Sequence, residues 1–223
     1  MNIFFKLKHY LAPYLYLKPS YKFNIVSKGF NLNYWVEGYA QNIINKKWTI
    51  ENGIPLGLYT QNLNFGLEKR VHIAGLCEYC FANIELGLEA KNIVVLDFLF
   101  KNISHEYDDK LDLEYSFWKT FSDPKNDIYY VHGMGQGQII SLLSRYWKLT
   151  KDPKYFKVLV NLSNSYLIDF NHKNGFVNLI EGTFFEEYPK RQDTDSKVLN
   201  GWIYSIIGLH DYLKSGNKIN KIG

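Results

Sequence analysis

The spacing of apolar residues near the end of the chain predicts a buried helix from Lys197 to Leu213. Apolar side chains occur on almost every side of this helix, whereas a surface helix shows a broad polar face. The apolar positions are Val198, Leu199, Trp202, Ile203, Ile206, Ile207 and Leu209. Before the helix, Pro189 keeps Tyr188 away from helical backbone angles. We therefore expect a turning segment that leads directly into a core helix.

Apolar residues recur every three or four positions in two further pairs of segments, which is the helical spacing. The first pair covers residues 68–89 and 93–103, and the second covers residues 133–149 and 152–170. The last of these segments starts with Asp152-Pro153, an N-cap followed by a proline in the first turn. Each pair predicts a helical hairpin.

Other segments show the patterns of strands and turns. From Leu111 to Phe117 apolar and polar residues alternate, which predicts a half-buried strand. Residues 20–66 are rich in Asn, Gly and aromatic residues and lack a sustained helical period, so they predict loops with short strands. Asn174-Gly175 indicates a turn, and residues 176–187, with a central glycine, suit two short strands.

Helical hairpins separated by short strand excursions predict a mostly α fold. The arrangement that fits best is an α/α toroid, in which inner helices are buried and the excursions gather at one end to form a site. Fewer helices are predicted than a closed toroid contains, so we expect an incomplete one. We treat residues 1–223 as a single domain.

Composition indicates a folded domain with a dispersed positive charge. Apolar residues make up 46% of the chain and aromatic residues 17%, which is sufficient for a core and excludes a disordered chain. The net charge of +4 comes from scattered lysines. This favours an anionic partner and argues against nucleic acid. Cys77 and Cys80 predict no disulfide framework and are expected to pack as small apolar groups.

The first 17 residues are apolar but do not predict a transmembrane segment. Lys6, Lys8, His9 and Pro13 interrupt them, and they fall short of the roughly 20 apolar residues that span a bilayer. They also lack the small-residue cleavage site of a signal peptide. We therefore expect a cytoplasmic protein, with a membrane-surface role for this segment as the alternative.

The segment before the last helix carries the strongest candidate chemistry. Glu186, Glu187 and Tyr188 place two carboxylates beside a phenol, after the aromatic pair Phe184-Phe185. One interpretation is a salt-bridged surface turn. The other is a desolvated carboxylate with a raised pKa, which can exchange protons. Arg191 is either a solvated charge or a bidentate ligand for a substrate carboxylate.

The HGMGQGQ run at residues 132–138 predicts a helix start. It lacks the Lys-Ser/Thr that completes a phosphate-binding loop. Its glycines allow close backbone approach, and the amides of Gln136 and Gln138 face either a sugar or a neighbouring helix. His132, directly before the glycines, is the histidine that we expect at a site. The six histidines form no cluster along the sequence, so no metal site and no Ser-His-Asp arrangement is predicted.

Three motifs in order resemble a known family. GMGQGQIISLLSRYWKLTKDPKYF at residues 133–156, FFEEYP at 184–189 and VLNGWIYSIIGLHDYL at 198–213 resemble the C-terminal catalytic domain of the D-glucuronyl C5-epimerases. The strongest match covers residues 130–213. These enzymes act on heparosan-type polysaccharides and have an α/α toroid, so the resemblance implies that fold and an anionic uronate polysaccharide as the partner.

The resemblance also implies a reaction. A base removes the C5 proton of D-glucuronate beside the carboxylate, and an acid on the opposite ring face returns a proton to give L-iduronate, without a cofactor. Glu187 and Tyr188 match the Glu-Tyr pair of the family and are identified with proton transfer on one ring face, whereas the acid of the opposite face has no matched residue. The candidate substrate ligands are Glu186, His132, Gln136, Gln138, Arg191 and Asn200.

Family members differ from this chain at both ends. They continue past the last helix into segments with further active-site tyrosines and an arginine, so we expect a C-terminally truncated chain with weak or no epimerisation. Eukaryotic members carry an N-terminal membrane anchor, which makes the Golgi lumen the alternative location. A homodimer is a further expectation. The alternative functions are a non-catalytic polysaccharide-binding remnant and a uronate polysaccharide lyase.

Overall fold

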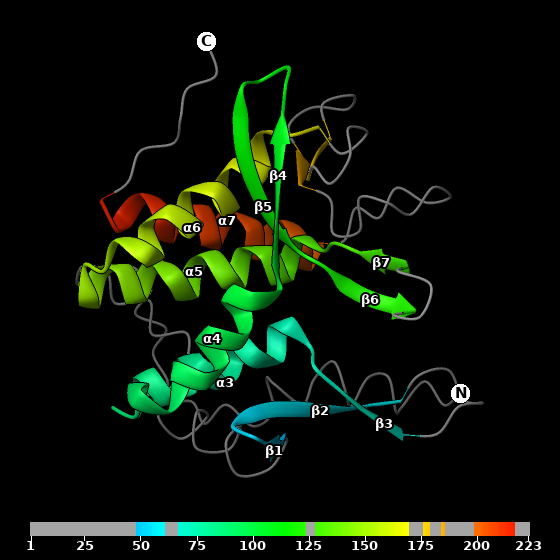
Figure 1. The fold of residues 1–223 in the computed structure, drawn as a ribbon, viewed down its shortest axis with the longest axis vertical. Coiled ribbons are helices and arrows are strands. Elements are labelled where there is room, and N and C mark those ends of the chain that lie inside the picture. The colour runs from blue at the N-terminus through cyan, green and yellow to red at the C-terminus, as the bar shows by residue number, and fades with distance from the viewer. Residues whose placement is uncertain are drawn as a thin grey trace.

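A computed structural model describes residues 48–60, 67–123, 128–169, 176–178, 184–185 and 199–216 of the chain. The predictions for residues 1–47, for the turn at 174–175 and for the segment 186–198 lie outside these residues. Within them, more residues lie in helices than in strands, which confirms the mostly α class (Figure 1). None of the described helices combines the length and the apolar composition needed to cross a membrane.

Five α-helices and nine short strands make up the described part. The helices are α3 (Ile73–Glu85), α4 (Ile93–Asn102), α5 (Gly133–Thr150), α6 (Pro153–Asn164) and α7 (Leu199–Lys214), with 3-10 turns η1 (Glu89–Asn92) and η3 (Ser165–Leu167). The strands are β1 (Trp48–Glu51), β2 (Ile54–Thr60), β3 (Leu67–Arg70), β4 (Ile103–Asp108), β5 (Leu113–Trp118), β6 (Thr120–Asp123), β7 (Ile128–Tyr130), β8 (Val177–Asn178) and β9 (Phe184–Phe185). All paired strands are antiparallel.

Helices α3, α5 and α7 run parallel to one another, and their N-termini lie at the same end of the helix layer (Figure 1). At this end Gly135 of α5 faces Ile73 of α3. Further along the helices, the Arg145 guanidinium lies 4.8 Å from the ring centroid of Phe81. Helices α4 and α6 run in the opposite direction, as expected for two helical hairpins (Figure 1). Excursions such as β6–β7 and β9 therefore emerge near the shared N-terminal end.

The packing of α5 against α7 is unusually close because glycines face one another. A Cβ atom on Gly137 would lie 2.1 Å from the carbonyl oxygen of Tyr204, and one on Gly208 would lie 2.4 Å from the carbonyl oxygen of Gly137. Only hydrogen fits at both positions. The expected close approach of the glycine-rich helix start to a neighbouring backbone is therefore confirmed.

The boundaries of α5 and α6 follow local rules. His132 is the N-cap of α5, and its side chain accepts a hydrogen bond from the Gly135 amide. Asp152 caps α6, which begins at a proline, as predicted. However, α6 ends at Asn164, whereas the sequence pattern predicts helix to Phe170. The polar side chains at its end bind backbone carbonyls instead, because the Asn164 amide donates to Glu114 and the Ser165 hydroxyl to Leu162.

The predicted strand at 111–117 is confirmed as β5, but its partner β4 and strand β3 were not expected. The pattern predicts helix at Ile103 and at residues 68–70, where strands occur. The β4–β5 turn is fixed by Asp108, which accepts hydrogen bonds from the amides of Lys110 and Leu111, and by the positive φ of Asp112. The two short strands expected in 176–187 are confirmed as β8 and β9.

Helix α7 is buried on one side only, so the prediction that it is buried all round is wrong. Its buried residues are Gly201, Ser205, Gly208, Asp211 and Tyr212. Leu199, Ile203, Ile206 and Leu213 are between 41% and 60% exposed. Because α7 approaches α5 through small residues, its large aliphatic side chains project away from the contact.

Replacement of Gly137 by alanine should destabilise the protein by about 1–3 kcal/mol, because the new methyl group collides with the α7 backbone. At an ordinary helix position the same change stabilises by roughly 0.5–1 kcal/mol, so the sign of the effect is diagnostic. Urea unfolding of Gly137→Ala, compared with Lys148→Ala on the exposed side of the same helix, measures it. A stabilised Gly137→Ala variant would contradict the packing described.

Candidate active site

Two histidines lie together where α3 and α5 begin. His72 and His132 are the N-cap residues of these helices, and their ring centroids are 5.8 Å apart in a stacked arrangement. His132 is only 4% exposed, and its Nδ1 accepts from the Gly135 amide at 3.1 Å. Burial, assisted by the charge of His132, lowers the pKa of His72 from 6.5 to about 4. His72 is therefore neutral at pH 7.

Gln136 and Gln138 lie inside the protein. They are 1% and 2% exposed. The Gln136 amide nitrogen donates to the carbonyl oxygens of Ser116 and Leu162 and to the Ser165 hydroxyl, at 2.9–3.0 Å. Of the two alternatives predicted for these amides, this geometry favours contact with neighbouring elements over contact with a sugar for Gln136. Gln136 thus ties β5 and the end of α6 to the start of α5.

The described residues closest in sequence to the candidate acid and phenol lie at this same end. Glu186, Glu187, Tyr188 and Arg191 lie outside the described residues, and so their geometry stays a prediction. Just before them, the Phe185 ring meets the edge of Tyr166 at a centroid distance of 5.0 Å.

Tyr166 in turn contacts both α5 and α7. The Tyr166 hydroxyl lies 3.1 Å from the carbonyl oxygen of Gly133 and 2.9 Å from the Ser205 hydroxyl. Helix α7 then starts at Leu199, and Asn200 is exposed in its first turn. The described residues that flank the segment 186–198, Phe185 and Leu199, therefore lie near α5 and at the start of α7.

The electrostatics of this end favour an anion. The N-terminus of a helix carries about half a positive charge, because its first amides point outward without partners. Three helices, α3, α5 and α7, begin here (Figure 1). A carboxylate, or an enolate formed from it, is stabilised by such a field. Among the described residues, no group of three His, Cys, Asp or Glu side chains is placed to hold a metal ion.

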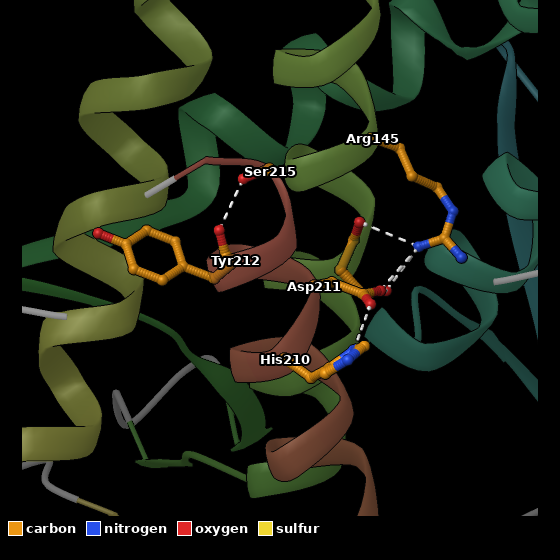
Figure 2. Close-up of polar contacts among 6 residues, drawn as sticks. Arg145, His210, Asp211, Tyr212 and Ser215 are labelled. Carbon is orange, nitrogen blue, oxygen red and sulfur yellow. Dashed lines mark hydrogen bonds and ion pairs between the residues drawn. The ribbon is translucent and has the colours of Figure 1, made fainter. Parts of the chain in front are cut away.

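A buried ion pair lies further along the same two helices (Figure 2). Arg145 of α5 donates to Asp211 of α7 at 3.0 Å and to the Ser141 hydroxyl at 2.7 Å. The Ser141 hydroxyl also donates to Asp211, and Nδ1 of His210 lies 3.5 Å from the second carboxylate oxygen. Asp211 is 0% exposed. Loss of hydration raises the pKa of Asp211, although Arg145 and Ser141 oppose this.

This ion pair was not predicted from the sequence, although one signal was present. Arg145 and Asp211 are charged residues within otherwise apolar helical segments, and a charge in such a place is buried only when paired. The sequence does not indicate that the two residues pair, since they are 66 positions apart.

The fold and the arrangement of this end define a helical domain with a candidate site for an anionic substrate. A family model described as the D-glucuronyl C5-epimerase C-terminus matches residues 110–222, just over half of the 223 residues. The chain therefore belongs to the D-glucuronyl C5-epimerase C-terminal family, which confirms the resemblance. A D-glucuronyl C5-epimerase of Caenorhabditis elegans is 39% identical over 80 residues. The match covers 35% of this chain and spans only 12% of the relative.

Removal of the negative partner of the ion pair should destabilise the fold more than removal of both partners. Asp211→Asn leaves the Arg145 cation buried without an anion, which costs about 3–5 kcal/mol. The double variant Arg145→Met/Asp211→Leu should recover at least half of this loss, because no charge is left in the interior. Urea unfolding of the single and double variants tests this. An equal loss of stability in the single and the double variant would show that the carboxylate does not act through Arg145.

The low pKa of His72 predicts a specific pH dependence of stability. Between pH 6.5 and about 4 the unfolded chain binds a proton at His72 that the folded chain does not. The free energy of unfolding should therefore fall by up to about 3 kcal/mol as the pH decreases through this window. In urea unfolding at several pH values, the free energy of unfolding of His72→Gln should not show this fall, whereas that of His105→Gln should. A His72→Gln curve parallel to that of the wild type would refute the assignment.

Proposed function

We propose that this chain inverts C5 of D-glucuronate residues to L-iduronate in a heparosan-like polysaccharide. The observation that carries the proposal is membership of the D-glucuronyl C5-epimerase C-terminal family over residues 110–222, a range that contains the FFEEYP motif. The gathered helix N-termini support it, because the substrate is a carboxylate and the intermediate is more strongly anionic at that group.

Glu187 and Tyr188 are the proposed proton-transfer residues. A base takes the C5 proton, and the electron pair of the C–H bond moves toward the carboxylate to give an enolate-like intermediate. Return of a proton to the opposite face inverts C5 and regenerates the carboxylate. The reaction is redox neutral, so no redox cofactor is required. Stabilisation of the intermediate requires positive groups, and the starts of α3, α5 and α7 supply them together with the proposed ligand Arg191.

The other candidate residues have two proposed roles, which are direct contact with the polymer and support of the helix end beneath it. Glu186, Arg191 and Asn200 are proposed to contact the polymer, and Asn200 is exposed at the start of α7. His132, Gln136 and Gln138 are buried in α5 or at its start. We propose that these residues support the N-terminal end of α5 beneath the substrate. The roles of Asn200, His132, Gln136 and Gln138 in this division follow from their exposure.

The parallel arrangement of α3, α5 and α7, with α4 and α6 running in the opposite direction, supports an arc of an α/α toroid (Figure 1). In such an arc the ends of the inner helices line the site. The cytoplasmic location and the homodimer remain predictions.

Incubation of the chain with heparosan in deuterated water should place deuterium at C5 of the uronate, detected by NMR, at a low rate in line with the weak epimerisation expected from the sequence. Tyr188→Phe should lower this exchange by about 10²–10⁴-fold, the typical contribution of a general acid or base, and should leave polymer binding nearly unchanged. Tyr107→Phe, at an exposed tyrosine of β4, is the matched control and should exchange as the wild type does.

Three outcomes would count against this function. Polymer binding without any C5 exchange would identify a binding remnant. An absorbing unsaturated uronate product would identify a lyase, which expels the C4 substituent after the same proton abstraction. Full exchange by Tyr188→Phe would exclude that tyrosine from proton transfer.

A further inference from the structure

The starts of α3 and α5 repeat the same local design. In each case a strand ends shortly before the helix, and the two residues between them are valine and histidine. Val71-His72 follows β3, and Val131-His132 follows β7. Both histidines have an extended backbone and are the N-caps of their helices, and the third helical position is a glycine in both, Gly75 and Gly135. The repeat therefore places two imidazole rings at equivalent positions.

The two rings are nevertheless used differently. His132 caps its own helix, because its Nδ1 accepts from the Gly135 amide at 3.1 Å. A Cβ atom on Gly135 would lie 2.6 Å from Cε1 of His132, so the ring is held tightly over the glycine. The side chain of His72 makes no such cap bond in α3. Its contacts include the stack on His132, with an angle of 29° between the ring planes. The His72 ring is thus oriented by His132 rather than by its own helix.

His72 is the more accessible member of this stack. It is half-buried, whereas His132 is buried. The stack lies at the end where α3, α5 and α7 begin, which is the end whose field favours an anion (Figure 1). A side chain that is fixed before a ligand arrives loses little entropy when it binds. His72 therefore presents a preoriented and partly accessible ring at the proposed active site.

The stack keeps both rings uncharged. A ring nitrogen that accepts from an amide carries no proton, so His132 is neutral in this geometry. Burial and a charge on His132 both lower the pKa of His72, and the positive ends of the helices act in the same direction. At pH 7 the His72 ring thus has one N–H group and no charge. Enzymes that form enolates use a neutral imidazole at a helix N-terminus to polarise the carbonyl group.

We propose that His72 is a further ligand of the proposed active site, where its neutral ring donates a hydrogen bond to the carboxylate of the uronate. His132 orients this ring and does not itself contact the substrate. The hydrogen bond strengthens as negative charge moves onto the carboxylate in the intermediate, and the proton stays on the ring. The choice of a uronate as the ligand rests on the proposed function, but binding of a carboxylate at His72 does not require turnover.

NMR of the imidazole nitrogens tests the proposal in the whole chain at pH 7. D-glucuronate should shift the His72 signals, which should remain those of a neutral ring, whereas D-glucose, which lacks the carboxylate, should leave them unchanged. His72→Ala should weaken glucuronate binding by about tenfold, as expected for loss of a hydrogen bond to a charged group. His72→Gln keeps a neutral N–H donor and should bind more tightly than His72→Ala. His105→Ala, at an exposed histidine of β4, is the matched control and should bind as the wild type does.

The signals of the unaltered chain keep the test decisive if His72→Ala fails to fold. His72 signals that do not respond to glucuronate, that respond equally to glucose, or that change to those of an imidazolium would overturn the proposal. Unchanged binding by a folded His72→Ala variant would overturn it as well. Deuterium exchange at C5 of heparosan is measured separately. Exchange without a response of His72 refutes only the role of this histidine, and a response of His72 without exchange refutes only the epimerase.

Discussion

The contact between α5 and α7 is the constraint on which the rest of the structure depends. Gly137 and Gly208 let the two backbones touch, and the Arg145–Asp211 ion pair closes the contact further along the helices. The glycines determine how near the helices lie. The ion pair fixes how far one helix is displaced along the other, since a buried guanidinium and carboxylate tolerate little misalignment. Because Asn200 lies in the first turn of α7, its position relative to α5 follows from this register.

Much of the fold could be predicted from local patterns. The Asp152-Pro153 start of α6 and the glycine-rich start of α5 follow rules that involve neighbouring residues only, and both are correct. Strand β4 was missed because Ile103 continues a helical spacing, and only pairing with β5 makes it extended. The burial of α7 was wrong for a related reason. Hydrophobic periodicity assumes that helices meet through large side chains, whereas this helix meets its neighbour through glycine and serine.

The candidate site shows the same division between local and long-range information. The motif that carries Glu187 and Tyr188 is recognisable because its residues are adjacent in the sequence. The stack of His72 on His132 and the hydrogen bonds of Gln136 join positions that are 20 to 60 residues apart. Periodicity contains no information about such pairings. Gln136 therefore looked equally suited to a sugar or to a helix, and only the fold distinguishes the two.

The burial of both cysteines has a practical consequence. Cys77 and Cys80 are the two cysteines of the chain, they lie in α3, and neither is accessible. Burial raises the pKa of both thiols above the ordinary value. Since the thiolate is the reactive form, the folded chain should resist alkylation and maleimide coupling. A cysteine introduced on the surface can then carry a spectroscopic label as the sole reactive sulfur, without mutation of the native pair.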